Sequence, residues 1–255
     1  MKPLFSEKIN ESLKKYQPTH VEKGLKCKRC GSEYDLYKFA PTKKHPNGYE
    51  YKDGCKCEIY EEYKRNKQRK INNIFNQSNV NPSLRDATVN NYKPQNEKQV
   101  KAKQTAKGFS TKEPKSLILQ GSYGTGKSHL AYAIAKAVKA KGHTVAFMHI
   151  PMLMDRIKAT YNKNAVETTD ELVRLLSDID LLVLDDMGVE NTEHTLNKLF
   201  SIVDNRVGKN NIFTTNFSDK ELNQNMNWQR INSRMKHNAR KVRVIGDDFR
   251  ERDAW

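Results

Sequence analysis

Short apolar runs alternate with amphipathic stretches through the second half of the chain. The run Leu181–Asp185 is almost wholly apolar up to its last residue, which is typical of a strand buried on both faces. Apolar runs separated by helical patterns predict an α/β domain with a parallel sheet. The predicted strands are Ser116–Gln120, Thr144–Ile150, Leu181–Asp185, Asn211–Thr215 and Lys241–Ile245.

Helical patterns fill the intervals between these strands. A helix from about Lys127 to Lys141 follows a glycine loop, and Gly142 can end it. Pro151 can begin the next helix, and Ser218 and Glu221 form a capping box for a later one. A basic helix is predicted at about Asn227–Asn238. Apolar residues at helical spacing in the first two helices after the loop helix are Leu153, Met154, Ile157, Tyr161, Leu196, Leu199, Phe200 and Val203.

The chain divides into three parts by composition. Residues 1–75 are polar, rich in tyrosine and contain every cysteine. Residues 76–110 contain Pro82, Pro94 and several lysines, and we interpret them as a linker and lead-in. Residues 111–255 hold the predicted α/β domain.

Charge and hydropathy limit the classes of function. Lys and Arg exceed Asp and Glu by 16, so we expect attraction to polyanions, with nucleic acid as the first candidate. Solubility or an acidic protein partner would also explain this charge. No run approaches the ~20 apolar residues of a membrane span, and the N-terminus lacks a signal-peptide core. We therefore expect a soluble cytoplasmic protein without a membrane partner.

A phosphate-binding loop follows the first predicted strand. The sequence from Gly121 to Ser128 fits G-x-x-x-x-G-K-[ST] between a strand and a helix, a context that disfavours a chance glycine turn. Lys127 is expected to reach the β- and γ-phosphates of ATP, and the Ser128 hydroxyl to bind Mg²⁺. The expected ATP-binding residues here are Gly121, Tyr123, Gly124, Thr125, Gly126, Lys127, Ser128 and His129.

Two carboxylates end the apolar strand at Leu181–Asp185. Asp185 is expected to hold Mg²⁺, and Asp186 to act as the general base for the attacking water, with Glu190 as the alternative base. Asn216 follows the fourth strand and is expected to position that water or contact the γ-phosphate, with Thr215 as a weaker candidate. The competing interpretations are solvated acids and a turn asparagine.

These motifs together resemble the AAA+ class, and more closely the bacterial and phage replicative-helicase loaders of the DnaC/DnaI type. The resemblance covers roughly residues 80–250 and is carried by GSYGTGKSHLAYAIA, LLVLDDMG, NIFTTNFS and WQRINSRM…DDFR. It implies an AAA+ (ASCE) P-loop ATPase fold. It extends to transposition helper ATPases, which are close relatives of the loaders.

The resemblance also implies roles for C-terminal arginines. Arg234 matches the arginine that loaders offer to a neighbouring subunit's γ-phosphate, with Arg230 as second candidate. Arg250 resembles the sensor arginine that contacts nucleotide in its own subunit. The insert Met152–Leu176 stands where loaders carry a helical element that contacts single-stranded DNA, although its Lys158 and Lys163 are offset by Asp155 and Glu167.

The four cysteines predict a structural zinc site. Cys27 and Cys30 form a CxxC, and Cys55 and Cys57 form a CxC after a spacing of 24 residues. His45 or His20 could replace one ligand, and free thiols or a disulfide are the alternatives. Loaders of the DnaI type carry a zinc-binding N-terminal domain that docks on the helicase, so the resemblance gives residues 1–75 that role. The basic run at residues 64–70 could contact DNA, an acidic partner or only water.

Three functions are compatible with the sequence. The first is an ATP-dependent loader, active as an ATPase, that binds a hexameric replicative helicase and helps place it on single-stranded DNA. It would self-associate when ATP-bound or on the helicase. The second is a transposition helper ATPase, and the third is a nucleotide-binding adaptor or inhibitor with little turnover. The paired cysteines favour the first over the second, and the intact Asp185, Asp186 and Arg234 argue against the third.

Overall fold

The computed structural model describes residues 17–77, 82–111, 115–162, 165, 167–189 and 192–251. The chain splits into two compact units, Met1–Asn66 and Lys67–Trp255. Helix α2 (Cys57–Gln77) begins in the first unit and ends in the second. Two residues named in the sequence analysis, Glu190 and Lys163, lie outside the described residues. Within those ranges, every helix is too short or too polar to cross a membrane.

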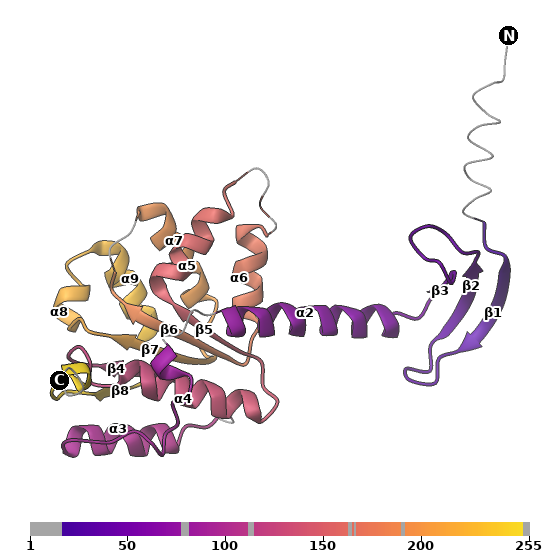
Figure 1. Cartoon of the computed structure of the whole chain (residues 1–255). Helices are drawn as coiled ribbons and strands as arrows, with labels where there is room; N and C mark the ends of the chain where they lie inside the picture. Colours follow the sequence, from indigo (N-terminus) through magenta and orange to yellow (C-terminus); the bar gives the residue numbers. More distant parts are fainter. Residues whose placement is uncertain are drawn as a thin grey trace, which may run out of the picture. The chain divides into compact units, whose positions relative to one another are not determined.

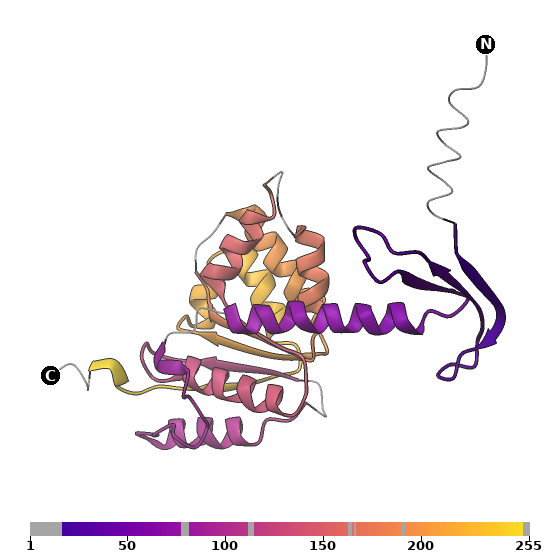
Figure 2. The same cartoon turned by 45° about the vertical axis from the view of Figure 1, so that its right-hand side comes forward.

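The first unit is built on a three-stranded antiparallel sheet in the order β1-β2-β3 (Figures 1 and 2). Phe39 and Tyr49 pair across two of its strands, with ring centroids 4.5 Å apart. Among the described residues of this unit only Leu36 and Cys55 are buried hydrophobic side chains. Such a small core needs a further source of stability, such as a bound metal. The strands are β1 (His20–Lys26), β2 (Glu33–Phe39) and β3 (Tyr49–Asp53).

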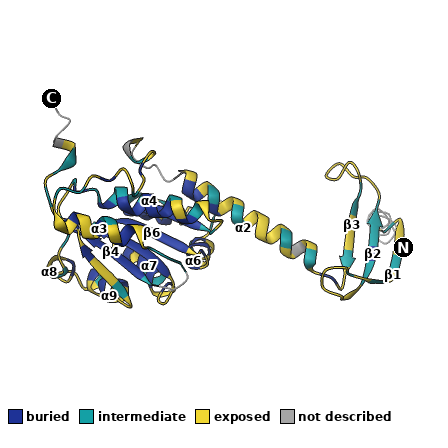
Figure 3. Ribbon diagram, turned by 90° about the horizontal axis from the view of Figure 1, so that it is seen from below, coloured by how far each residue is buried: buried dark blue, intermediate teal, exposed yellow. Residues whose placement is uncertain are grey.

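The second unit is organised by a five-stranded parallel sheet in the order β5-β6-β7-β4-β8. Its three central strands are buried on both faces, as their apolar sequences predict (Figure 3). The order places the ends of β6 and β7 side by side next to the end of β4. The strands are β4 (Ser116–Gln120), β5 (Val145–His149), β6 (Leu181–Met187), β7 (Asn210–Thr215) and β8 (Ala239–Arg243).

Two helical layers cover this sheet. Alternate strand residues face different layers: Leu117 and Leu119 pack with α3 and α4, whereas Ile118 packs with the helices of the other side. Figure 1 shows α3 and α4 on one side of the sheet and α5, α6, α7 and α9 on the other. The α/β fold predicted from the sequence is therefore confirmed. The helices of the two layers are α3 (Glu97–Lys107), α4 (Lys127–Ala140), α5 (Ile150–Ala159), α6 (Thr169–Ser177), α7 (Glu193–Asp204) and α9 (Met226–Met235), and the short helix α8 (Asp219–Leu222) follows β7.

The lead-in before β4 contains a helix that the sequence analysis did not predict. Helix α3 is capped by Asn96, whose side chain accepts a hydrogen bond from the Gln99 N–H. It buries the small residues Ala102 and Ala106 against the sheet. The lead-in also contains a short 3₁₀ turn, η1 (Pro82–Leu84). The capping box of Ser218 and Glu221 is confirmed at the start of α8.

Candidate functional site

The phosphate loop lies between β4 and α4, and its backbone requires glycine, as Gly126 and Gly121 show. Gly126 adopts φ 83° as the N-cap of α4, and a Cβ there would lie 2.5 Å from the Tyr92 ring. A Cβ on Gly121 would lie 2.0 Å from the Val244 carbonyl oxygen, in the segment that follows β8. The loop is held from outside as well, because the Tyr92 hydroxyl donates to the Thr125 carbonyl at 2.9 Å. The motif is thus a fixed loop that presents backbone N–H groups at a helix N-terminus, the geometry that binds phosphates.

Lys127 is the cation of this loop. Its side chain is buried, and its ammonium donates to the Ser122 carbonyl oxygen at 2.5 Å. Burial lowers the pKa of Lys127 to about 8, while the nearby carboxylates of Asp185 and Asp186 oppose that shift. A desolvated ammonium in contact with a backbone carbonyl gains energy when an anion enters beside it, so Lys127 fits the phosphate-binding role.

Asp185 ends the buried part of β6 beside the phosphate loop. Its Oδ1 accepts a hydrogen bond from the Thr214 hydroxyl at 2.6 Å, and Ser128 is a second hydrogen-bonding partner. Desolvation raises the pKa of Asp185, whereas these hydrogen bonds lower it. A buried carboxylate next to a hydroxyl supplies the hard oxygen ligands that Mg²⁺ prefers. Asp185 and Ser128 therefore fit a magnesium site.

Asp186 is turned into the pocket by a local distortion of β6. The register between β6 and β7 shifts between Leu184 and Met187, and Asp186 has φ 66°, a left-handed conformation unusual for a residue other than glycine. Its Oδ1 accepts a hydrogen bond from the Asn216 amide at 2.9 Å. The Nε2 of His149, at the end of β5, lies 3.7 Å from its Oδ2. The bulge thus presents a carboxylate held between an amide and an imidazole.

These residues line one pocket of about 730 Å³, a size typical of a small-ligand site. His129 lies on its wall, and its Nε2 is 2.9 Å from the Thr88 carbonyl oxygen. Thr215, the weaker alternative to Asn216, donates its hydroxyl to the Met187 carbonyl at 2.6 Å and is buried. The expected site residues that line the pocket are Tyr123, Gly124, Gly126, Lys127, Ser128, His129, Asp185, Asp186, Asn216 and Arg250.

The segment after β8 lies against the phosphate loop. The Phe249 N–H donates to the Gly124 carbonyl at 3.0 Å, and the Thr125 hydroxyl donates to the Val244 carbonyl at 2.8 Å. Arg250 reaches the pocket from this segment and forms a 2.6 Å ion pair with Asp248. That ion pair lowers the pKa of Asp248 to about 2. Arg250 is therefore placed within reach of a ligand in its own subunit.

Arg234 lies elsewhere, on α9 and outside the lining of the pocket. Its Nε is 2.5 Å from Asp204 Oδ1, and its guanidinium lies 5.8 Å from the centre of the Phe200 ring. Arg230 stacks on the same ring at 4.3 Å. Both side chains are thus held on the surface of α7 and α9, where a neighbouring molecule could meet them.

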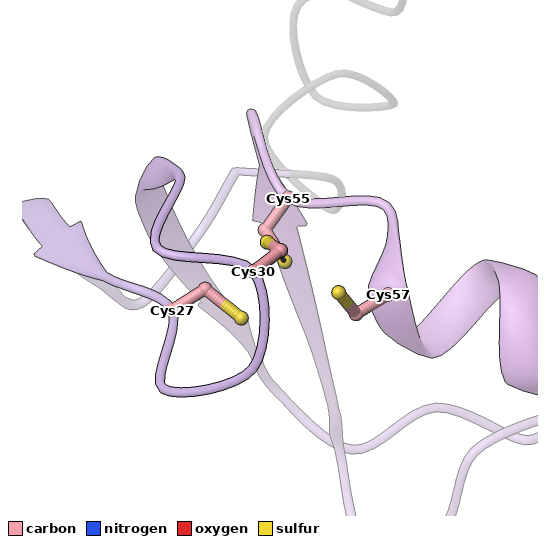
Figure 4. Close-up of side chains that lie close together, drawn as sticks. All are labelled: Cys27, Cys30, Cys55 and Cys57. Atoms are coloured by element: carbon pink, nitrogen blue, oxygen red, sulfur yellow. Dashed lines mark hydrogen bonds between the residues drawn. The ribbon is translucent and has the colours of Figure 1, made fainter.

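The first unit brings the four cysteines together (Figure 4). Their sulfur atoms all lie within 4.8 Å of one another, and Cys30 Sγ is 3.8 Å from Cys55 Sγ. Tetrahedral zinc with Zn–S bonds of ~2.3 Å places its sulfurs about 3.8 Å apart, so the four thiols fit this ion. Neither alternative ligand joins the cluster: His45 packs on the Tyr49 ring, and His20 pairs with Glu22.

The pKa values of these thiols also favour a bound metal ion. Hydrogen bonding with Ser32 lowers the pKa of Cys30 to about 6. Hydrogen bonding with Cys30 raises the pKa of Cys57 to about 12. One thiolate in the cluster makes ionisation of the next thiol less favourable. A divalent cation bound to all four sulfurs would offset this by stabilising the deprotonated ligands.

Several residues that line the nucleotide pocket were not predicted from the sequence, among them Tyr92, His149 and Thr214. Tyr92 lies in the lead-in, where no motif marks it, and His149 and Thr214 stand at strand ends without a recognisable spacing. Only the order of the strands in the sheet shows that His149 and Thr214 lie beside the site. Asp186 raises the pKa of His149 by hydrogen bonding.

Comparisons with known proteins agree with this geometry. Residues 40–254 match the family described as IstB-like ATP binding protein. The chain is 29% identical to YdaV of Escherichia coli over 81% of this chain and 77% of that protein. It is 32% identical to the replicative helicase loader DnaC of Escherichia coli over 55% of this chain, and the match spans 59% of DnaC. A crystal structure of the DnaC helicase loader superposes with a TM-score of 0.55 at 26% identity, covering 64% of this chain and 99% of that one. The chain therefore belongs to the family of IstB-like ATP-binding proteins, with the DnaC-type helicase loaders among its relatives.

Proposed function

We propose that this protein is an ATP-dependent loader that binds a hexameric replicative DNA helicase and helps deposit it on single-stranded DNA at the initiation of replication. The observation that carries the proposal is the pocket that joins the phosphate loop, Asp185 and Asp186 in a chain similar to a replicative helicase loader. Because the match spans 59% of DnaC, the helicase and the DNA strand are proposed partners of this chain.

The pocket supports binding and hydrolysis of ATP. Loop N–H groups and Lys127 would hold the phosphates, and Ser128 and Asp185 would hold Mg²⁺, which would supply positive charge that neutralises the phosphates. Asp186 accepts the proton of the attacking water, and Asn216 orients that carboxylate through its 2.9 Å hydrogen bond.

Two arginines complete the proposed site. Arg250 contacts nucleotide within its own subunit. Arg234 serves the site of an adjacent subunit, since it lies on α9 outside its own pocket. Hydrolysis is then weak in the isolated chain and stimulated by assembly.

Each part of the chain has its own proposed role. Residues 1–75 dock on the helicase, with zinc on Cys27, Cys30, Cys55 and Cys57 as a structural ion. Residues 76–110 lead into the ATPase domain at 111–255. A transposition helper would share the ATPase domain but bind duplex DNA and a transposase instead.

Co-purification with candidate hexameric helicases, with and without ATP, tests this function. We expect a stable complex with one replicative helicase. Its composition or affinity should change with ATP for the natural sequence but not for Lys127→Ala, whose site lacks the phosphate-binding cation. If the protein forms no helicase complex but binds duplex DNA and a transposase, the function is that of a transposition helper and not of a loader.

A further inference from the structure

The two helical layers of the ATPase unit differ in charge. Helix α3 has one carboxylate, Glu97, and α4 has none. The same two helices are rich in lysine even without Lys127 of the nucleotide site. These lysines are Lys98, Lys101, Lys103 and Lys107 on α3, Lys136 and Lys139 on α4, and Lys141 at the C-cap of α4.

None of these seven lysines forms an ion pair within the described part of the chain. Lys103 and Lys136 donate to backbone carbonyls, which leaves their charge unneutralised. The Lys139 ammonium lies 4.0 Å from the centre of the Phe75 ring. Lys98, Lys101 and Lys107 are exposed. The outer surface of α3 and α4, which we call the lysine face, therefore carries unneutralised positive charge.

The opposite layer contrasts with the lysine face. Several of its cations pair with carboxylates: Arg156 lies 2.8 Å from Glu167, and Lys158 lies 3.9 Å from Asp155. On the same side, Arg234 pairs with Asp204, and Lys236 and Lys241 pair with Asp219. The insert Met152–Leu176, where the family resemblance implies DNA contact, thus has few cations available for a polyanion.

The lysine face is rigidly attached to the sheet. Asn96 caps α3 and also donates to the Ile245 carbonyl oxygen at 2.8 Å, and Gln99 donates to the same oxygen at 3.3 Å. Lys103 fixes the preceding loop through the Tyr92 carbonyl at 2.6 Å. Arg240 adds an exposed cation on the neighbouring edge strand β8. The charges are therefore presented by packed elements.

We propose that the lysine face binds the phosphate backbone of nucleic acid, as a DNA-contact surface separate from the insert. Repeated lysines with a single carboxylate, Glu97, on the same two helices suit a regularly charged polyanion, because each neutralised phosphate releases counterions. Ammonium groups contact phosphates as point charges, so the binding is independent of base sequence. The inference deepens the DNA role of the proposed function, and its test needs no helicase.

The test measures fluorescence anisotropy of a labelled oligothymidylate with the full chain over a series of salt concentrations. The face variant carries Lys98→Gln, Lys101→Gln and Lys107→Gln. The matched control removes three cations that lie outside both the lysine face and the insert, by Lys198→Gln, Lys209→Gln and Lys220→Gln. Each phosphate contact contributes about 0.7 to the slope of log K against log salt for single strands, so the face variant should lose about 2 in slope. The control should keep both slope and affinity.

Equal ATP affinity in both variants establishes that they are folded. The proposal is overturned if the face variant binds the oligonucleotide with unchanged slope and affinity, or if the control loses as much. It is also overturned if the face variant loses only binding to polyglutamate, which would assign the surface to an acidic protein. Helicase co-purification by the face variant is measured separately, so failure here does not depend on the loader function.

Discussion

Thr214 connects the two acidic residues of the nucleotide site, and its replacement by valine tests how the site is held. Its hydroxyl donates to Asp185 Oδ1 at 2.6 Å and accepts from the Asp186 N–H at 2.8 Å. The side chain is 1% exposed, so water cannot replace either bond. Thr214→Val keeps the branched shape but leaves a buried carboxylate oxygen and a backbone N–H without this partner.

The expected loss of stability follows from these two groups. A buried polar group left unpaired costs about 1–3 kcal/mol, and more when it is charged, so we expect about 2–5 kcal/mol for Thr214→Val. The lost hydrogen bond also lowers the pKa of Asp185 in the natural protein, hence the variant carboxyl is harder to ionise. We expect the Mg²⁺ concentration for half-maximal ATP binding to rise at least tenfold, which corresponds to about 1.4 kcal/mol.

Thr215→Val is the matched control for this variant. Thr215 is also 1% exposed, and its hydroxyl bonds the Met187 carbonyl and the Phe217 N–H, not Asp185. Urea unfolding should show a loss in both variants, whereas titration of Mg²⁺ with a fluorescent ATP analogue should distinguish them. If both variants need the same Mg²⁺ concentration, the hydrogen bond from Thr214 does not affect Mg²⁺ binding by Asp185.

Three further predictions concern other parts of the protein. Asp186 raises the pKa of His149 above its usual 6.5, so protonated His149 restrains the carboxylate base, and hydrolysis should increase as pH rises through that raised pKa. His149→Ala should abolish this limb of the pH–rate profile, and an unchanged limb would assign it to another group. Purified protein should contain about one zinc per chain by elemental analysis, lost in the double variant Cys27→Ser/Cys30→Ser; metal content that survives this change contradicts the ligand set. Arg234→Ala should abolish assembly-stimulated hydrolysis but retain ATP affinity; trans arginines in GTPases contribute about 10³–10⁵ in rate. Mixing this variant with Asp186→Asn should restore some turnover, and a mixture that stays inactive although both variants assemble argues against action across subunits.

The strand pattern and the phosphate loop could be predicted because both are local. An apolar run such as β6 and a glycine loop before a helix have few alternative structures. The last strand was placed two residues too late, since Val244 is buried like a strand residue but belongs to the segment that crosses the phosphate loop. Its pairing with β4 fixes the register, and pairing is not visible in the sequence of one strand.

Other features depend on tertiary packing. Helix α3 was missed because it buries alanines and an uncharged Gln99, which give a weak amphipathic pattern. Arg206 is fully buried and donates to the backbone carbonyls of Leu176 and Ile179, a role opposite to the one its residue type predicts. His149 and Thr214 join the site only because β5 and β7 flank β6.

Deposition of the helicase on a closed circular single strand tests the central claim most directly. A closed helicase ring cannot thread onto a circle without a free end, so stable association requires a protein that opens or assembles the ring. We expect this protein, with ATP and Mg²⁺, to increase the amount of its partner helicase that co-elutes with circular single-stranded DNA, and Lys127→Ala to give no such increase. Equal amounts of helicase on the circle with and without this protein, for a helicase that it demonstrably binds, would contradict the loader function.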